Sequence, residues 1–344
     1  MQTVSDIVNA RRIIDGPEDN LRAVSANRYP WATPLYEQML ANNWDHKQVP
    51  LLRDKKQFNG LSKGCQFAYR SALAFLSNLD AIQVDNLTNN VAGIITDPTV
   101  RKLLTRQTFE EAVHNDAYSA IIEVLFKDPL TIYNMAGSVP MLKSKNALIT
   151  ENSKQVTLKP TPQNKVKAFV SNIVLEGVYF FSGFLNFYTI ARSEGKMLET
   201  KDMIKYIQRD ELTHLDVFSN IYLSCKQERP EVFTSELKEE CQQIFRDAAV
   251  LETAWGHYSI QHGVPGLTEE GISRYIENRA EQCARMIGLG GIFAKSYNPY
   301  TWMEEYSSIK TMNKTSKNFF EGKNTRYSEI RPNFTIGRTR ELAI

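Results

Sequence analysis

The sequence has few cysteines, no excess of one charge sign and no continuous apolar run in its first 25 residues. Its four cysteines are too widely spaced for CxxC pairs or a zinc framework, which predicts reduced thiols in a cytoplasmic protein: Cys65, Cys225, Cys241 and Cys283. The first 25 residues hold no continuous apolar run that could form a signal-peptide core, so we expect no secretion. The 41 lysines and arginines nearly balance the 39 aspartates and glutamates, and the net charge of +2 gives no electrostatic reason to expect nucleic acid or an anionic membrane as a partner.

Segments with the alternating pattern of a β-strand are also scarce. From about Leu61 onward, apolar residues recur at spacings of three and four, which is typical of amphipathic helices. Proline-containing segments such as KDPL and LKPTPQNK separate the helical stretches. The sequence therefore predicts an all-α protein. We expect its helices near residues 35–41, 62–93, 98–126, 130–147, 164–193, 198–222, 232–258 and 266–287.

The segment AFVSNIVLEGVYFFSGFLNFYTIA, residues 168–191, is apolar enough to raise the question of a membrane span. It carries Glu176 near its centre and has no second span to pair with, so a helix buried on nearly all sides of a large bundle is the better interpretation. An isolated charged carboxylate inside such a helix is strongly disfavoured. Glu176 therefore needs a partner, such as a hydrogen-bond donor or a bound cation.

Histidines are scarce as well, but two of the five stand in closely similar settings. The segments EEAVH and DELTH are the only ones with an acidic residue three positions before a histidine. Residues i and i+3 lie on one face of a helix, so Glu111 with His114, and Glu211 with His214, can each point at one metal ion. Because the motif is repeated on two separate helices, a metal site is preferred over two unrelated surface pairs.

Such motifs need further carboxylates to complete a site for two metal ions. A bundle core that holds two Glu-x-x-His motifs and one carboxylate from each of two other helices binds a metal pair. Glu176 supplies one of these carboxylates. The other should lie on a long apolar helix before residue 111, where RSALAFLSNLDAIQVDNL offers Asp80 and Asp85. Asp80 has the more apolar surroundings and is the preferred candidate.

This ligand pattern resembles that of a known enzyme family. The small, radical-generating (beta) subunit of class I ribonucleotide reductase has a similar set in the same order, which in this chain is Asp80, Glu111, His114, Tyr118, Glu176, Glu211 and His214. The resemblance covers roughly residues 25 to 290. It implies a homodimer with a ferritin-like helical bundle over residues 26–305, an N-terminal arm over residues 1–25 and a tail over residues 306–344.

The resemblance implies two iron ions per protomer as the cofactor. Each ion would have a terminal carboxylate and imidazole, and two glutamates would bridge the pair: Asp80 with His114, Glu176 with His214, and Glu111 and Glu211 as bridges. The site would activate oxygen and leave a radical on Tyr118, which shares a helix face with Glu111 and His114. Three apolar residues would close the pocket around the radical, although plain core packing explains them equally well: Phe180, Phe184 and Ile207.

The resemblance also implies that the oxidising equivalent passes to a large catalytic subunit, which reduces ribonucleotides to deoxyribonucleotides. Trp44 matches the family's tryptophan by its setting before the first long helix, and Asp210 matches the aspartate that links it to a metal-bound histidine. Residues 306–344 carry eight lysines and arginines against three glutamates, which predicts a flexible tail that docks on the large subunit. Tyr327 is the candidate relay tyrosine of this tail, by its position alone.

Several alternatives stay open at the level of the sequence. Oxygen and imidazole ligands suit iron and manganese alike, so a dimanganese site with a flavodoxin-like activator, or a mixed manganese–iron cofactor, is an alternative to iron. A ligand-binding dimetal oxidase of the same superfamily would share the carboxylates without needing Trp44 or the tail. A fatty-acyl desaturase would be expected to bind a carrier protein and to have a long apolar substrate channel. A ferritin-type metal-storage protein would need a much shorter chain and no tyrosine beside the metals.

Overall fold

The computed structural model describes residues 3–19, 21 and 25–306 of the chain. These residues form helices and contain no β-strand, which confirms the all-α prediction. The α-helices are α1 (Val4–Ala10), α2 (Ala32–Ala41), α3 (Leu52–Phe58), α4 (Lys63–Asn86), α5 (Pro98–Leu125), α6 (Leu130–Ser138), α7 (Pro140–Leu158), α8 (Pro162–Val174), α9 (Phe181–Glu194), α10 (Leu198–Glu228), α11 (Ser235–Ile260) and α12 (Glu269–Met286). Short helical segments join them: the π-helical η2 (Leu87–Val91) and η4 (Leu175–Tyr179), and the 3-10 helices η1 (His46–Gln48), η3 (Ala92–Ile94), η5 (Pro230–Val232) and η6 (Thr301–Tyr306).

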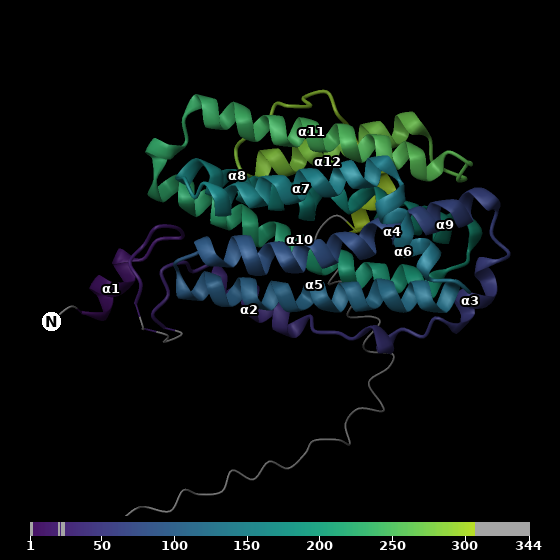
Figure 1. The fold of residues 1–344 in the computed structure, drawn as a ribbon, viewed down its shortest axis with the longest axis horizontal. Coiled ribbons are helices and arrows are strands. Elements are labelled where there is room, and N and C mark those ends of the chain that lie inside the picture. The colour runs from purple at the N-terminus through teal and green to yellow at the C-terminus, as the bar shows by residue number, and fades with distance from the viewer. Residues whose placement is uncertain (1–2, 20, 22–24, 307–344) are drawn as a thin grey trace, which may run out of the picture.

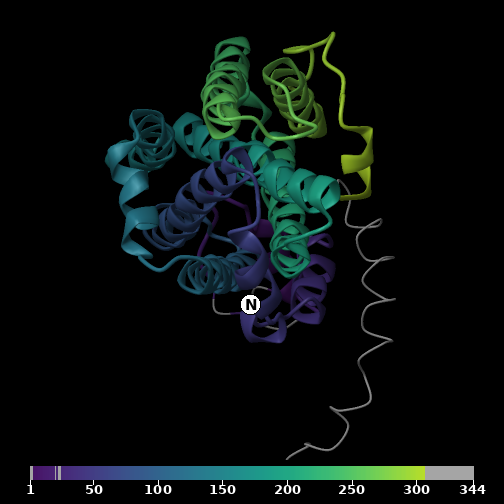
Figure 2. The same cartoon turned by 90° about the vertical axis from the view of Figure 1, so that its right-hand side faces the viewer.

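The long helices run along the longest axis of the molecule (Figure 1). An inner bundle consists of α4, α5, α10 and the consecutive α8 and α9, in which α4 packs on α5 and α9, and α10 packs on α8 and α9. On one side of this bundle, α11 packs on α12 and α8, and on another side α2 covers α5. Figure 2 looks along the long axis and shows α11 and α12, in green and yellow-green, as a pair at the top.

Local signals at the helix starts explain why two of the inner helices begin where they do. The Asp97 side chain accepts hydrogen bonds from backbone N–H groups in the first turn of α5, and Pro98 occupies a position whose N–H would have no helical partner. Thr161 and Pro162 start α8 in the same way. The sequence thus sets the starting points of two helices that carry or precede the predicted ligands.

The prediction of one helix over residues 130–147 is wrong. Helix α6 ends at Ser138, and α7 begins at Pro140 and continues to Leu158. Proline lacks the N–H that would bond to the preceding turn, and it disfavours helical geometry in the residue before it. Val139 accordingly has φ −88° and ψ 113°, so the chain turns between the two helices.

The helix predicted near residues 164–193 is present over residues 162–194, but it is not a regular α-helix throughout. The π-helical segment η4 lies between α8 and α9 and contains Glu176. Such π-helical turns often occur at functional sites, and they change the helical register of the residues that follow. The residues that follow Glu176 therefore do not keep the regular α-helical spacing. Gly177 allows a close approach here, because a Cβ at this position would lie 2.5 Å from Cys283 Sγ of α12.

Two short helices, α1 and α3, were not predicted. Each has seven residues, which is too few for a clear helical period. After α1 the chain lies against the bundle, where Ile13 is buried. The Ile13 carbonyl accepts a hydrogen bond of 2.8 Å from the Thr96 N–H, and the Ile13 N–H donates one of 3.1 Å to Glu228. The first part of the chain is therefore attached to the helical bundle.

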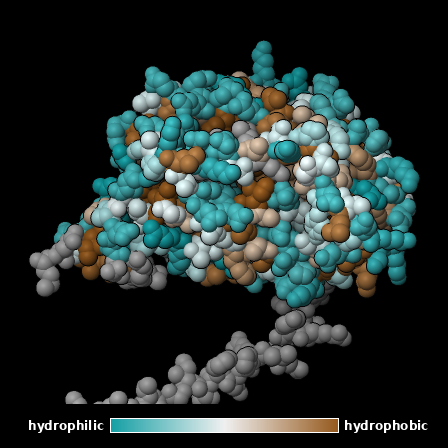
Figure 3. Space-filling view, viewed as in Figure 1, coloured by the Kyte–Doolittle hydropathy of each residue, from teal (hydrophilic) through white to brown (hydrophobic). Residues whose placement is uncertain are grey.

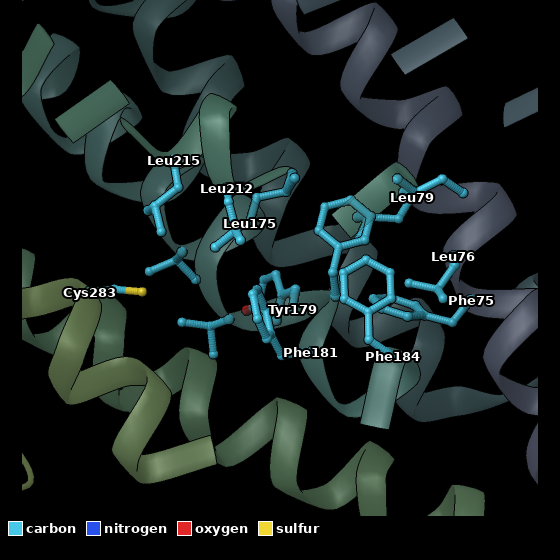
Figure 4. Close-up of a cluster of buried hydrophobic side chains, with 14 of the residues drawn as sticks. Phe75, Leu76, Leu79, Leu175, Tyr179, Phe181, Phe184, Leu212, Leu215 and Cys283 are labelled. Atoms are coloured by element: carbon cyan, nitrogen blue, oxygen red, sulfur yellow. The ribbon is translucent and has the colours of Figure 1, made fainter. Parts of the chain in front are cut away.

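The apolar segment around Glu176 lies at the centre of the bundle. Within the described ranges, residues 162–194 are long and apolar enough to cross a membrane, but their most apolar window is entirely buried in the protein. Figure 4 shows Phe184 of this segment beside Phe75, Leu76 and Leu79 of α4. This burial supports the interpretation as a core helix. On the outer face seen in Figure 3, apolar residues are scattered among hydrophilic ones.

Candidate metal centre

Six side chains predicted as metal ligands meet inside the inner bundle, and all six are fully buried. They come from α4 (Asp80), α5 (Glu111, His114), η4 (Glu176) and α10 (Glu211, His214). Their ligand atoms form two overlapping groups, each within 4.8 Å: Asp80, Glu111, His114 and Glu211, and Glu111, Glu176, Glu211 and His214. Glu111 and Glu211 belong to both groups, as two bridging carboxylates would. Asp85, the competing candidate, is exposed.

Both imidazoles face the carboxylates with the same ring nitrogen. His114 Nδ1 lies 3.0 Å from Glu211 Oε1 and 3.6 Å from Glu111 Oε2. His214 Nδ1 lies 2.9 Å from Glu211 Oε2 and 3.1 Å from Glu111 Oε1. Each histidine therefore contacts both the glutamate of its own helix and that of the other helix.

The donor set fits two divalent cations. Several buried carboxylate oxygens have no hydrogen-bond partner among the described residues: both oxygens of Asp80, and one each of Glu111 and Glu176. Buried polar atoms without partners are costly, so such a group points to an ion that the protein would bind. Together the four carboxylates can carry four negative charges, which two divalent cations would neutralise.

Burial and mutual proximity change the pKa of these groups. Burial raises the pKa of Asp80 and Glu176 well above the usual range, and the neighbouring glutamates raise it further. Burial opposes the charged form of His114 and His214, but the facing carboxylates outweigh it and hold the pKa of both imidazoles well above the usual range. In Glu211 the two imidazoles outweigh burial and lower the pKa. Without metal, the site therefore retains protons that cations would displace.

The outer nitrogen of His114 faces the predicted radical-transfer residues. His114 Nε2 lies 3.3 Å from Asp210 Oδ2, and the Trp44 indole N–H donates a hydrogen bond of 2.7 Å to the same oxygen. The other Asp210 oxygen accepts hydrogen bonds of 3.1 and 3.0 Å from Arg209. A carboxylate in this position fixes the orientation of the imidazole. The contacts have the connectivity predicted for Trp44 and Asp210.

The outer nitrogen of His214 has a corresponding partner that the sequence analysis did not assign. His214 Nε2 lies 3.0 Å from Glu110 Oε2, and Arg106 donates a hydrogen bond of 3.1 Å to the other oxygen of Glu110. Arg106 also donates to the Asn43 side chain at 3.0 Å. The sequence contained a signal for this role, because an acidic residue precedes the Glu-x-x-His motif in both EEAVH and DELTH.

Two buried glutamines that the sequence analysis missed contact Glu176. Gln83 and Gln107 donate hydrogen bonds of 2.6 and 2.9 Å to Glu176 Oε1. Gln83 lies three residues after Asp80 on α4, and Gln107 lies four residues before Glu111 on α5, so each shares a helix face with a predicted ligand. They hold one oxygen of Glu176 and leave the other without a hydrogen bond.

Tyr118 is fully buried, and its hydroxyl has no hydrogen-bond partner among the residues described. Burial raises its pKa well above the usual range, and the nearby Asp80 raises it further. The predicted pocket residues are also fully buried, and the rings of Phe180 and Phe184 stack at 5.8 Å and 11°. Ile207 has no exposed surface either. Tyr118 is thus a protonated phenol inside the core, near a predicted ligand.

A series of aromatic rings leads away from His114. Its imidazole stacks on Trp44 at a centroid distance of 6.1 Å, and Trp44 stacks on Tyr206 at 5.3 Å. Tyr206 was not predicted as a site residue. Tyr327 lies outside the described residues, so the structure does not test the proposed relay tyrosine.

Comparison with known proteins identifies the family. The family model described as "Ribonucleotide reductase, small chain" matches residues 23–299. The chain belongs to this family. A ribonucleoside-diphosphate reductase subunit beta of Halalkalibacterium halodurans is 32% identical over 321 residues, which is 92% of each chain. One from Treponema pallidum is 30% identical over 328 residues, covering 94% of this chain and 92% of the relative.

Solved structures of ribonucleotide reductase small chains have the same fold. The R2 subunit from Clostridium botulinum aligns with a TM-score of 0.83 and 36% identity, covering 86% of this chain and 94% of that one. The dimanganese(II)-NrdF of Streptococcus sanguinis aligns with a TM-score of 0.73 and 20% identity, covering 84% of this chain and all of that one, and shows the fold alone. The ferritin-like bundle expected from the resemblance is therefore confirmed.

As a ribonucleotide reductase small chain, the protein is the beta subunit of an oxidoreductase that makes deoxyribonucleotides. Small chains of this family form dimers and act with a large catalytic subunit. The matching relatives are reductase subunits, which favours this function over a storage protein, a desaturase or a ligand-binding oxidase. The buried carboxylates and imidazoles fit the metal binding expected of it.

Proposed function

We propose that Tyr118 carries the radical of this subunit and that Asp210 and Trp44 pass its oxidising equivalent toward the large subunit. One observation supports this most directly: a fully buried set of carboxylates and imidazoles adjoins a fully buried tyrosine on the same helix. Tyr118 lies one turn after His114 and close enough to Asp80 to respond to its charge. A tyrosine so placed can be oxidised at the metal site while the protein excludes water.

Each predicted ligand has a defined part in holding the two ions. Asp80 and His114 would be the terminal ligands of one ion, and Glu176 and His214 those of the other. Glu111 and Glu211 would bridge the two ions. When bound, the metal pair supplies the oxidising power that follows reaction with dioxygen. Gln83 and Gln107 hold one oxygen of Glu176, so that its other oxygen is directed to the site.

Tyr118 must lose a proton together with its electron. Its raised pKa keeps the phenol protonated at neutral pH, and the surrounding core cannot stabilise a charged ring. Phe180, Phe184 and Ile207 are proposed to exclude water and small reductants from the neutral radical. The complete burial of these three residues supports this role, and they pack in the hydrophobic core at the same time.

The transfer path begins at Asp210 and Trp44. Trp44 can lose an electron while its indole proton moves along the hydrogen bond of 2.7 Å to Asp210. Arg209 holds the other carboxylate oxygen and keeps Asp210 in place. We propose that residues 306–344 dock on the large subunit and that Tyr327 continues the path there.

We propose two iron ions as the cofactor of each protomer in a cytoplasmic homodimer. The donor set accepts manganese equally well, and the Streptococcus sanguinis protein of the same fold contains dimanganese(II). A dimanganese site in this chain would require a flavodoxin-like activator, and a mixed manganese–iron pair is the third choice. The identity of the metal depends on supply and activation as well as on these ligands.

The deciding experiment is electron paramagnetic resonance of protein loaded anaerobically with ferrous iron and then exposed to oxygen. The wild type should show a tyrosyl radical, and Tyr118→Phe should bind the same amount of metal without that signal. A wild type without a radical would contradict iron as the activating metal. A radical that persists in Tyr118→Phe would place the radical on another residue.

A further inference from the structure

We propose that Tyr206 is a redox-active residue of the transfer path and carries the oxidising equivalent between Trp44 and the protein surface. This inference rests on the proposed function, because Tyr118 is taken as the source of the radical. The observations that support it are the stacking, the exposure and the chemistry of Tyr206.

Tyr206 lies on α10, one helical turn before Asp210, so the two residues share a face of the helix. Its ring stacks on the Trp44 indole at a centroid distance of 5.3 Å and an angle of 27°. The Trp44 indole in turn stacks on His114 at 6.1 Å and 26°. These distances lie within the range of about 4.5–7 Å for interacting aromatic rings. Tyr206 therefore extends the His114–Trp44 pair by one ring in direct contact.

The series of rings leads outward from the metal centre. The exposed fraction rises from 0% at His114 to 5% at Trp44 and 9% at Tyr206. Tyr206 is the most exposed of the three, although its side chain is still largely buried. Of the three rings, Tyr206 therefore offers the largest accessible surface to a group that receives the oxidising equivalent.

The side chain at position 206 has the chemistry that such a step needs. A phenol can lose one electron at a driving force comparable with that of an indole, whereas leucine or phenylalanine would fill the same space without being oxidised. The Arg209 guanidinium lies 5.4 Å from the centre of the Tyr206 ring. This contact holds the ring in place and disfavours a positively charged ring, so Tyr206 must lose its proton with the electron.

The proposed step is balanced in electrons and protons. One electron passes from the Tyr206 phenol to the oxidised Trp44 indole, and the indole nitrogen regains its proton from Asp210 across their hydrogen bond. The phenolic proton of Tyr206 leaves to water at the 9% of the residue's surface that is exposed. Trp44 and Asp210 return to their starting states, and a neutral Tyr206 radical remains to oxidise the next group on the path.

The test compares three proteins in complex with the large subunit, substrate and reductant: wild type, Tyr206→Phe and protein with 3-aminotyrosine at position 206. Tyr206→Phe should retain the metal content, the Tyr118 radical and the binding to the large subunit, but lose turnover. The aminotyrosine is easier to oxidise than tyrosine, so it should trap the oxidising equivalent and give an aminotyrosyl radical signal. Tyr222 on the same helix is the control for both changes, because it lies 16 residues, or about 24 Å, further along α10.

The outcomes separate this inference from the proposed function. If the wild type forms no radical on Tyr118, the proposed function fails before Tyr206 is tested. If the wild type is active and Tyr206→Phe keeps full turnover, Tyr206 is not on the path. If turnover is lost but 3-aminotyrosine at position 206 gives no radical signal, the residue only positions Trp44, and the proposal is likewise overturned.

Discussion

Glu110 and Asp210 each contact the histidine of the other helix. Glu110 stands in the EEAVH segment of α5 but lies 3.0 Å from His214 of α10, and Asp210 of α10 lies 3.3 Å from His114 of α5. The two acids therefore cross-link the two ligand helices on the outer side of the metal centre. Each also accepts hydrogen bonds from an arginine, Arg106 or Arg209. This crossed arrangement orients both imidazoles toward the carboxylates.

Removing the Glu110 charge should weaken metal binding. In Glu110→Gln, His214 loses the carboxylate that fixes its orientation, and outer partners of this kind contribute about 10–100-fold in metal affinity. Competition titration with a metal-sensitive chelator measures this effect. Glu123→Gln, an exposed position on the same helix, is the control and should bind as the wild type does. Equal affinities for both variants would show that Glu110 does not support the ligand.

Metal affinity should rise with pH. The raised pKa of Asp80 and Glu176 means that both carboxyl groups hold protons in the metal-free protein up to higher pH than usual, and the imidazoles also hold theirs. Binding requires the deprotonated forms, so cations must displace protons, and acidification must weaken binding. Isothermal titration in buffers of different ionisation enthalpy counts the protons released. The Asp80→Asn variant should release fewer protons on metal binding than the wild type. Metal binding by the wild type without any proton release would contradict the raised pKa of these groups.

Trp44→Phe should separate radical formation from turnover. Phenylalanine keeps an aromatic ring beside His114 but cannot donate to Asp210 or lose an electron as readily as an indole. We expect the metal content and the yield of the Tyr118 radical to stay unchanged, and turnover in the complex with the large subunit to be lost. Spin counting and a deoxyribonucleotide assay on the same samples measure both quantities. Trp31→Phe, which removes a hydrogen bond to Ser224 instead, should remain active, and an active Trp44→Phe would exclude the indole from the path.

Deleting residues 325–344 should spare the radical and abolish activity with the large subunit. The deletion removes Tyr327 together with the end of the tail, neither of which lies in the described part of the structure. Tyr327→Phe distinguishes the two roles, since it should bind the large subunit normally and still fail to turn over. Binding is measured by surface plasmon resonance, and turnover by product formation. Full activity of the shortened protein would disprove both docking and relay by the tail.

Breaking the buried ion pair between Lys145 and Glu252 should lower the stability of the protein without affecting the metal site. Lys145 of α7 and Glu252 of α11 are both fully buried and form an ion pair, and Ser182 also donates to Glu252. Lys145→Met leaves the Glu252 charge unpaired, and breaking such a pair costs about 3–5 kcal/mol. Adding Glu252→Gln should restore most of the loss.

Urea unfolding of the metal-loaded proteins measures the Lys145 effect. Lys143→Met, an exposed position on the same helix, is the control and should change the free energy of unfolding by less than about 0.5 kcal/mol. If the double variant is no more stable than Lys145→Met alone, the loss comes from packing around the lysine rather than from the unpaired carboxylate.

The sequence by itself predicted the six side chains of the candidate ligand set that the structure brings together. Glu-x-x-His places each glutamate and its histidine on one helix face whatever the rest of the protein does, because that spacing is a property of the helix. The repetition of the motif on α5 and α10, and the cost of burying Glu176 and Asp80, then predicted a shared site. The same local logic predicted most helices, because apolar residues at helical spacing and prolines at the boundaries act over a few residues.

Only the tertiary structure decided which residues meet across the bundle. Glu110 and Asp210 precede their own helices' motifs, yet each contacts the opposite histidine, and Tyr206 stacks on a tryptophan that lies far away in the sequence. Such contacts depend on how the helices are packed and rotated against one another, and sequence spacing does not contain that information. The π-helical turn at Glu176 also changes the rotation of the residues that follow it.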